Sequence, residues 1–521
     1  MQNRHYVLVV GTGLALLGAA ACNNDKLTSL NNNPNSPADV PVPTIFLNAA
    51  RTAVSRWVGN GYDLRGTEWV VQHLAEVQYP DEDDYKRLQA SSTTTWFDNP
   101  YQSELEDFRK VIQKGLKSND ASVWAPAQIM RTWDFAYLTN SFGDVPYFQA
   151  LQGDSTGSTL TPTYDKQQDI YNDFFKQLDA ASKALTGAGN TLGASDPIYG
   201  GDPALWQKFA NSLRLRLAMQ IVNIDAATAS TQIAAALAAP GGVFKSNDDN
   251  ATISWPGDGV YNNPWSDNFA GRDDHRMSQT FMNLLIGLKD GRIRVFATTT
   301  TKDTLVGTDA SFANYAGMPN GLVQATAQPY FNDTSRPGLI FWPPANLAAV
   351  AGGTGKATPT YLMTFAEVSL IQAEAANRGL GGLAAAGAQA FYNAGVSASF
   401  DQWGITSQAG SYLAQSNVAY AGGANGLVQI DTQEWIALFT DGGTTWSLWR
   451  RTCVPNTVKP GPDAITNIVP RRFEYSNTEY AVNLAQVKAA NDRQGPDDLT
   501  TPMWWDVQTA APTNTPNCGH I

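Results

Sequence analysis

The sequence predicts a mainly α-helical fold that carries long, aromatic-rich loops and few short strands. Apolar residues recur at helical spacing in several stretches, and the segments between them are long and rich in Gly, Pro, Asn and Thr. Aromatic residues make up 11% of the 521 residues, enough to supply ligand platforms in addition to a core. Because long loops in a folded protein are more often functional than filler, we expect a helical scaffold that presents a binding surface.

Four stretches carry the helical pattern most clearly. Asp202 and Pro203 have the residue types of an N-cap and a first helical position. Another helix is expected after Pro126, and it should end near Phe142 with Gly143 as a left-handed C-cap. The apolar faces are Ile129, Trp133, Ala136 and Tyr137; Ile170, Phe174, Leu178, Ala181 and Leu185; Trp206, Phe209, Ala210, Leu213 and Leu217; and Leu362, Phe365, Ala366, Leu370 and Ala373.

Shorter signals complete the predicted scaffold. Glu374 precedes Arg378 by four residues, the favourable order for an ion pair on a helix. The helical pattern continues through Trp435 and is interrupted at Gly442, while 252–255 could form a short strand. No clean repeat of about 34 residues is visible, so a regular helical array is not predicted from spacing. The irregular segments are 81–100, 150–162, 240–275 and 298–358.

The first 22 residues have the layout of a secretory signal peptide. A basic start is followed by an apolar run over 6–17, four small residues and then Cys22. The run is shorter than the roughly 20 residues that a membrane span needs. We therefore predict a bacterial lipoprotein whose lipidated first residue is Cys22, although Ala19 stands where lipoproteins usually have Leu. The alternative is an ordinary secreted protein.

The predicted domain organisation follows from this leader. Residues 1–21 form the lipoprotein signal peptide, and 22–43, which are rich in Asn and Pro, form a flexible tether. Residues 44–521 are expected to fold as a single ligand-binding domain. The net charge of −12 argues against nucleic acid and against electrostatic binding to anionic lipid, so membrane attachment should come from the lipid on Cys22.

Cysteine and histidine usage limits the bridges and ions that the chain can form. Cys453 and Cys518 could pair in an oxidising compartment, and two separate buried thiols are the alternative. The few histidines form no Cys/His metal pattern, and no cofactor is expected. The acidic runs 81–84 and 248–249 could hold structural calcium, but they lack the spacing of a known calcium loop and a solvated acidic loop is the alternative. Nothing selects a pair of carboxylates for glycoside hydrolysis, so we predict a binding protein and not an enzyme.

Six segments resemble, in the expected order, signatures of the SusD/RagB-like outer-membrane lipoproteins. One departure is Ser476, where the family usually has Pro. We interpret these signatures as scaffold, in which Arg450 and Arg451 pair with carboxylates or cap carbonyls. The segments are 138–147 (LTNSFGDVPY), 161–171 (TPTYDKQQDIY), 208–218 (KFANSLRLRLA), 366–375 (AEVSLIQAEA), 433–451 (QEWIALFTDGGTTWSLWRR) and 470–475 (PRRFEY).

The resemblance implies a SusD-like fold with degenerate tetratricopeptide-like helix pairs and a loop-rich face. It also implies a lipid-anchored protein on the outer surface of a Gram-negative bacterium. Such proteins bind a nutrient, usually a glycan, and cap a SusC-like TonB-dependent barrel transporter. A peptide-binding lid of the same type, a surface glycoside hydrolase and a purely structural lipoprotein are the alternatives.

Loop aromatics beside amide or acid groups are the candidate ligand-binding residues. An aromatic ring covers the apolar face of a sugar, and Asn, Asp or Arg binds its hydroxyl rim. Burying one such face at roughly 25 cal/mol per Å² gives a few kcal/mol, so several rings should share the binding. For each candidate the alternative is packing within the loop. The candidates are Trp96, Asp98, Asn99 and Tyr101; Trp255, Tyr261, Asn262 and Trp265; and Trp342.

Overall fold

The computed structural model describes residues 40–153, 159–300 and 311–507. The predicted signal peptide, Cys22, most of the tether and Cys518 lie outside the described residues. The chain divides into two units, 1–41 and 42–521, and the description below concerns the second. No described helix has the length and apolar character to cross a bilayer.

The structure is mainly helical, as predicted. An eight-residue π-helical segment, η1 (Asn60–Thr67), follows the first helix. Short helices are α4 (Glu68–Val70), α5 (Pro80–Asp83), α14 (Ile293–Phe296), α15 (Gln324–Ala327), α18 (Ala409–Leu413) and α21 (Asn477–Val482). The longer helices are α3 (Val42–Trp57), α6 (Thr94–Gln102), α7 (Glu104–Lys117), α8 (Ala121–Phe142), α9 (Gln167–Ala184), α10 (Pro203–Gln220), α11 (Ala226–Ala238), α12 (Pro264–Gly271), α13 (Gln279–Gly287), α16 (Phe365–Asn377), α17 (Ala388–Gln402), α19 (Gly423–Ala437), α20 (Gly442–Thr452) and α22 (Leu484–Gln494).

The described strands are short and form three separate antiparallel pairs. β1 (Leu74–Glu76) pairs with β5 (His275–Met277), β2 (Val145–Pro146) with β3 (Tyr164–Asp165), and β4 (Ala251–Ile253) with β6 (Thr360–Met363). The predicted strand at 252–255 is thus present, shifted by one to two residues. The pairs β1–β5 and β4–β6 join segments that are distant in sequence, and β2–β3 flanks a loop. The strands therefore hold loops against the helical scaffold.

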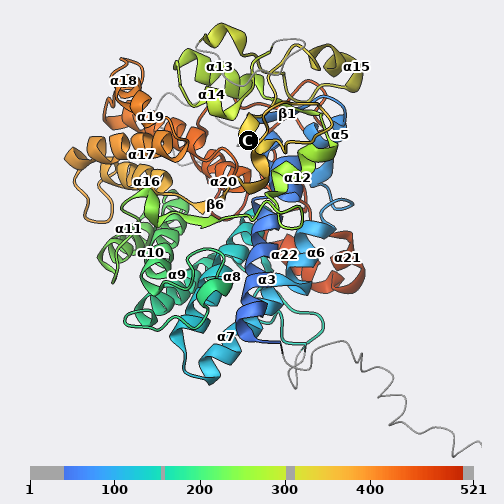
Figure 1. Ribbon diagram of the computed structural model, residues 1–521. Coiled ribbons are helices and arrows are strands. Elements are labelled where there is room, and N and C mark those ends of the chain that lie inside the picture. The colour runs from blue at the N-terminus through green and yellow to red at the C-terminus, as the bar shows by residue number, and fades with distance from the viewer. Residues whose placement is uncertain (1–39, 154–158, 301–310, 508–521) are drawn as a thin grey trace, which may run out of the picture. The chain divides into compact units, whose positions relative to one another are not determined.

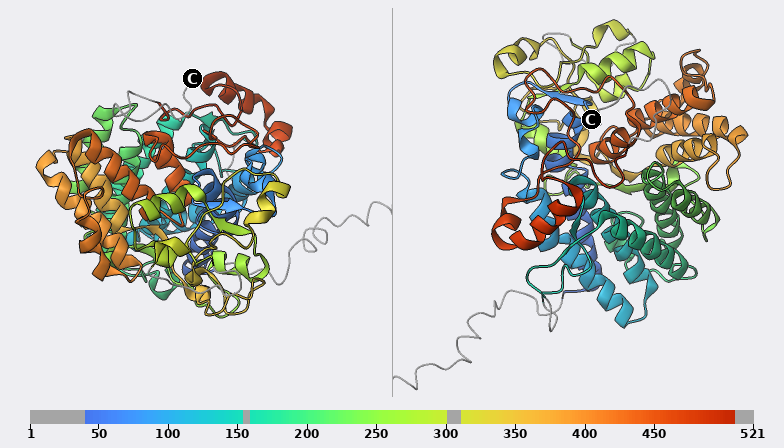
Figure 2. Two further views of the ribbon diagram at one scale, coloured as in Figure 1. Left: turned by 90° about the horizontal axis from the view of Figure 1, so that it is seen from above. Right: turned by 180° about the vertical axis from the view of Figure 1, so that it is seen from behind.

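Consecutive helices pack side by side and form the scaffold. α7 packs on α8, α8 on α9, α9 on α10 and α10 on α11, while α16 packs on α17 and α19 (Figure 1). Contacts between α10 and α16 join these two groups, which the view from behind also shows (Figure 2). The arrangement agrees with the predicted helix pairs. The long segments at 240–275 and 311–358 carry only short helices and strands, as expected.

Helices α9 and α10 confirm the periodicity argument. Every residue of the two predicted apolar faces is buried. Asp202 caps α10, because its carboxylate accepts the backbone N–H groups of Ala204 (2.8 Å) and Leu205 (3.3 Å). An apolar stripe that repeats every three to four residues can be buried continuously only in a helix.

Two predicted helix assignments were wrong. α8 begins at Ala121 instead of Pro126, because the Asp120 carboxylate accepts the N–H of Ser122 (3.0 Å) and starts the helix earlier. Its end at Phe142 agrees with the prediction, and Gly143 has φ +83°. Leu362 belongs to strand β6, since Thr364 caps α16 at a later position.

The break at Gly442 also differs from the prediction. α19 ends at Ala437, and Gly442 is the first residue of α20, which Asp441 caps through the N–H of Thr444 (3.0 Å). The glycine therefore begins a helix instead of ending one. A Cβ at Gly442 would lie 2.7 Å from both Thr67 Oγ1 and Glu68 N, so close contact with η1 requires glycine here.

The scaffold signatures make the expected contacts. Arg451 binds both oxygens of Glu374 (2.6 and 2.8 Å), which also pairs with Arg378 (2.8 Å) as predicted. Arg450 donates to the carbonyls of Asn140 and Arg471 (both 2.7 Å). Both arginines are buried and hold helices together inside the protein.

Cys453 follows α20 in the left-handed region at φ +60° and is disulfide-bonded. The other two cysteines, Cys22 and Cys518, lie outside the described residues. The predicted pairing with Cys518 therefore stays a prediction.

Asp431 on α19 gives a pH prediction. Its side chain is buried, and its Oδ1 has no hydrogen-bond partner. Burial, with the nearby Glu374 carboxylate, raises its pKa from 3.8 to about 8. Because the folded state holds this proton more tightly than the unfolded chain, the contribution to stability is complete below about pH 4 and is lost as the pH rises to about 8.

The substitution Asp431→Asn should remove this loss. The melting temperature of the variant minus that of the original protein should therefore be larger at pH 9 than at pH 5. Differential scanning calorimetry at both pH values measures the change. A difference that stays constant, or that moves the other way, would show that Asp431 is charged throughout.

Candidate functional site

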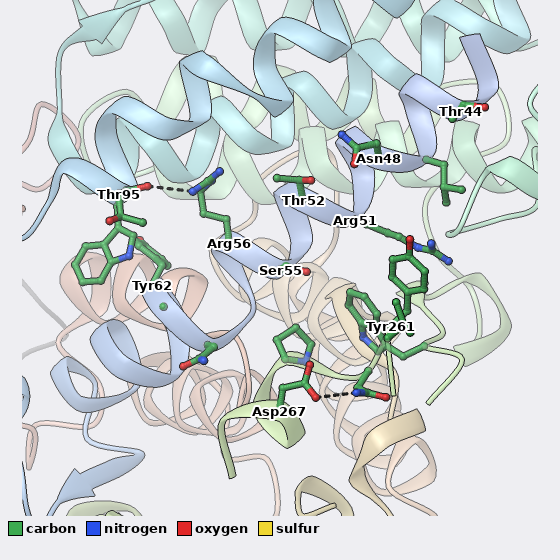
Figure 3. Close-up of a pocket in the computed structure, with 18 residues that line it drawn as sticks. Thr44, Asn48, Arg51, Thr52, Ser55, Arg56, Tyr62, Thr95, Tyr261 and Asp267 are labelled. Atoms are coloured by element: carbon green, nitrogen blue, oxygen red, sulfur yellow. Dashed lines mark hydrogen bonds between the residues drawn. The ribbon is translucent and has the colours of Figure 1, made fainter. Parts of the chain in front are cut away.

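A cavity of about 710 Å³ opens between α3, η1, the start of α6 and the 255–267 segment (Figure 3). This volume is within the range of roughly 300–1,000 Å³ that small-ligand sites occupy. Four of the nine candidate ligand-binding residues line it: Trp96, Trp255, Tyr261 and Asn262. The remaining lining residues are Thr44, Leu47, Asn48, Arg51, Thr52, Ser55, Arg56, Asn60, Gly61, Tyr62, Thr95, Val260, Pro264 and Asp267.

One face of α3 supplies the polar wall of the cavity. The opposite face of the helix is buried in the core through Phe46, Ala49, Ala50, Ala53, Val54 and Trp57. Residues three or four apart share one side of a helix, so the α3 residues that line the cavity form a second stripe, which points away from this core. The α3 residues with this spacing at the cavity are Thr44, Leu47, Asn48, Arg51, Thr52 and Ser55.

A tight turn places Tyr261 at the rim of the cavity. Asp258 Oδ1 accepts the N–H groups of Val260 and Tyr261 (both 2.8 Å), and these two donors lower the pKa of the carboxyl. Gly257, at φ +68°, donates its N–H to the Tyr261 carbonyl (3.0 Å). Tyr261 is 47% exposed, and the Arg51 guanidinium lies 4.4 Å from its ring centroid. The ring is therefore fixed in place while much of it stays open to solvent.

Two polar atoms of the cavity are shielded from solvent and have no hydrogen-bond partner. They are Arg51 Nε, a donor, and Asn60 Oδ1, an acceptor. Leaving a buried polar group unpaired costs about 1–3 kcal/mol. A ligand that displaces the groups covering these atoms, and that offers an acceptor to Arg51 and a donor to Asn60, would recover this cost. The pair is thus a candidate polar contact for a bound molecule.

The two tryptophans form apolar walls. Trp96 is 2% exposed and packs between Tyr62 and Phe473, with ring centroids 5.9 and 5.4 Å away. Trp255 is 6% exposed, and its Nε1 donates to Thr360 Oγ1 (2.8 Å). Neither ring offers a free face for stacking, so Tyr261 is the exposed aromatic platform among the lining residues.

Asn262 holds the turn instead of contacting a ligand. Its Nδ2 donates to Asp267 Oδ1 (2.8 Å, dashed in Figure 3), and its Oδ1 accepts the N–H of Gly259 (3.0 Å). Asp267 is the one carboxylate among the lining residues described above. Glycoside hydrolysis needs two carboxyl groups across the scissile bond, so this arrangement is suited to binding.

The comparisons with known proteins assign the family. A family model described as starch-binding associating with outer membrane, SusD-like, matches residues 34–476. This chain belongs to the SusD-like family. No curated protein matches it.

Solved structures agree with this assignment. A chitin-binding protein is 29% identical and aligns over 89% of this chain and 100% of its own, with a TM-score of 0.74. A chitin-binding SusD homologue from Flavobacterium johnsoniae is 27% identical over 90% of this chain and 99% of its own, also with a TM-score of 0.74. A SusD homologue from Bacteroides uniformis, at 23% identity, covers 90% of this chain and 100% of its own with a TM-score of 0.73 and shows the shared fold.

Two predicted aromatic platforms are buried inside this SusD-like chain. Trp265 is 2% exposed and donates from Nε1 to Asp63 Oδ2 (3.0 Å). Trp342 is fully buried, donates to the Pro337 carbonyl (2.8 Å) and stacks on Phe269 with centroids 4.7 Å apart. Both rings fill the core beneath the loops, so neither can receive a sugar in this conformation.

The group after Trp96 is also scaffold. α6 begins at Thr94, so successive side chains point about 100° apart and cannot share one face. Asp98 accepts a hydrogen bond from Ser476 Oγ (2.9 Å), and the Tyr101 hydroxyl donates to the Pro146 carbonyl (2.7 Å). Asn99 is half-buried, and none of the three lines the cavity.

One carboxylate in each of the acidic runs that could hold calcium is paired with cations. Glu82 binds Arg65, Arg87 and Arg272, and Asp249 binds Lys208 Nζ (2.6 Å). Structural calcium at these runs stays a prediction.

Buried and exposed aromatics of this SusD-like protein should respond differently to truncation. Trp342→Ala should lower the free energy of unfolding by about 3–5 kcal/mol, because it leaves a cavity in the core. Tyr261→Ala should change it by less than about 0.5 kcal/mol, because the ring is at the surface. Urea unfolding followed by fluorescence measures both. Equal losses would contradict the burial assigned to the two rings.

Proposed function

We propose that this chain binds a nutrient glycan at the outer membrane and that the cavity beside α3 is the binding site. The observation that carries the proposal is the combination of one exposed ring, Tyr261, with two unpaired polar atoms, Arg51 Nε and Asn60 Oδ1. The ring suits the apolar face of a sugar, and the polar atoms suit its substituents.

The ligand class that fits best is a β-linked oligomer of N-acetylglucosamine. An acetamido group carries one N–H donor and one carbonyl acceptor, which complement the unpaired acceptor on Asn60 and the unpaired donor on Arg51. Two similar structures, at 29% and 27% identity, are described as chitin-binding, which supports this choice.

The chain acts at the cell surface as a lipid-anchored lid of a SusC-like TonB-dependent transporter. Membership of a family described as associating with the outer membrane supports the location. The leader and Cys22 support the anchor, since a Cys directly after small residues is the attachment point of bacterial lipoproteins. Modest affinity suits this role, because the protein must release its ligand to the transporter.

Chitin oligomers should bind to the purified chain, and Tyr261→Ala should weaken that binding by roughly 10- to 100-fold. This loss corresponds to about 1.5–3 kcal/mol, the contribution of one buried side chain. Isothermal titration calorimetry with chitohexaose, maltohexaose and a peptide mixture measures affinity and class together. Measurement of reducing ends in the same samples tests for hydrolysis.

Tyr79→Ala is the matched control. Tyr79 is 52% exposed and lies 4.5 Å from the Arg272 guanidinium, which resembles the Tyr261–Arg51 pair, but it does not line the cavity. Loss of binding in Tyr79→Ala with none in Tyr261→Ala would place the site elsewhere. Binding of peptides alone, or release of reducing ends, would contradict the proposed function.

The anchor has its own test. Cys22→Ala should prevent acylation and move the protein from the membrane fraction to the soluble fraction, because no described helix can hold it in a bilayer. Mass spectrometry of the mature N-terminus and fractionation by ultracentrifugation measure the two effects. An unmodified Cys22 in the native protein would contradict the lipoprotein prediction.

A further inference from the structure

A buried cluster of a histidine and two carboxylates lies apart from the cavity. The antiparallel pairing of β1 and β5 places Glu76 directly opposite His275, and Asp274 immediately precedes His275. One ligand atom from each of the three side chains lies within 4.8 Å of the other two. All three residues are at most 1% exposed. We propose that Glu76, Asp274 and His275 form a binding site for a zinc ion.

The cluster contains a carboxylate oxygen, Glu76 Oε2, that has no hydrogen bond and only a long ion-pair contact of 3.6 Å with Arg272 Nη2, which points to a missing partner. Glu76 Oε1 accepts the N–H groups of Gln78 (2.8 Å) and Tyr79 (3.1 Å), but Oε2 accepts no hydrogen bond. His275 Nε2 also has no hydrogen-bond partner. Burying a carboxylate oxygen without a hydrogen bond is costly, and a cation bound beside it would remove that cost. The ion would take His275 through Nδ1, the nitrogen that faces Asp274.

The spacing of the donor atoms fits a metal ion. His275 Nδ1 lies 3.1 Å from Asp274 Oδ1. Two ligands at roughly 2.0–2.1 Å from a tetrahedral zinc ion are about 3.3 Å apart, so only a small adjustment is needed. One imidazole and two carboxylates would neutralise the ion, and the fourth position would be open to water.

The ligand types favour zinc over calcium or magnesium. Calcium takes six to eight oxygen ligands, and magnesium prefers an octahedral oxygen shell with several waters. A nitrogen ligand, few donors and full burial are instead typical of zinc and related transition metals.

Arg272 is the cation that competes for these carboxylates. Its Nη2 lies 3.6 Å from Glu76 Oε2, and its guanidinium also pairs with Asp274. The same Nη2 lies 3.1 Å from Glu82 Oε2, and Nη1 lies 3.5 Å from Glu82 Oε1. Because Glu82 can keep Arg272 in place, an ion can take Glu76 and Asp274 without leaving the arginine unpaired. The bound ion would then clamp β1 to β5.

The test uses the full-length mature chain, purified without a polyhistidine tag and stripped with a chelator. Titration with ZnCl₂ should show one ion per chain and a rise in melting temperature. Cobalt substitution should give the intense visible absorption of a four-coordinate site. Elemental analysis and calorimetry measure stoichiometry and affinity, and neither depends on glycan binding.

Glu76→Gln and His275→Gln should each weaken zinc binding by more than about 100-fold, which exceeds the roughly 10- to 100-fold effect of losing a supporting group. Asp81→Asn, which changes an exposed acid on the short helix α5, is the control and should bind zinc normally. Circular dichroism checks that the variants fold. Absence of stoichiometric zinc in the original protein, undiminished binding in both variants, or binding of calcium in place of zinc would overturn the proposal.

Discussion

The buried carboxylate of Asp63 joins the three segments on which the cavity depends. Its Oδ1 accepts the N–H of Gly442 at the start of α20 (2.6 Å), and its Oδ2 accepts Nε1 of Trp265 on α12 (3.0 Å). Asp63 itself belongs to η1, which also carries Asn60. One side chain therefore attaches both η1, which carries Asn60, and α12, which follows the Tyr261 turn, to the core helix α20. Burial raises the pKa of Asp63, and the neighbouring carboxylates Glu68 and Asp441 raise it further.

The proposed binding role rests on the groups that packing and pairing inside the protein leave available. Most aromatic rings in the described part of the chain are buried, and arginines such as Arg450 pack against them, with the Arg450 guanidinium 3.6 Å from the Trp446 ring centroid. At the cavity, by contrast, Arg51 keeps an unpaired nitrogen and Tyr261 keeps an exposed ring. The chemistry available there is hydrogen bonding and ring contact without a second carboxylate. This combination supports capture and release of a sugar more than its cleavage.

The helical scaffold was predictable from the sequence, and about half of the candidate site was not. α9 and α10 were evident because an apolar stripe leaves a local signal, and α10 also has a capping residue, Asp202. Trp342 was misassigned because its segment has no periodicity, and residue type alone does not reveal burial. Arg51 was missed although the polar stripe of α3 is visible in the sequence. Its role depends on contact with Tyr261, which lies far away in the chain and is brought close only by the tertiary fold.

A crystal structure of the mature chain with a bound chitin oligomer tests the central claim most directly. The account predicts a sugar ring against Tyr261, with its acetamido group within hydrogen-bond distance of Arg51 Nε and Asn60 Oδ1. The backbone segments joined by Asp63 should keep their positions, and only the groups that cover Arg51 Nε and Asn60 Oδ1 should move aside. An oligomer bound to another surface, with the cavity beside α3 filled only by water, would contradict the account.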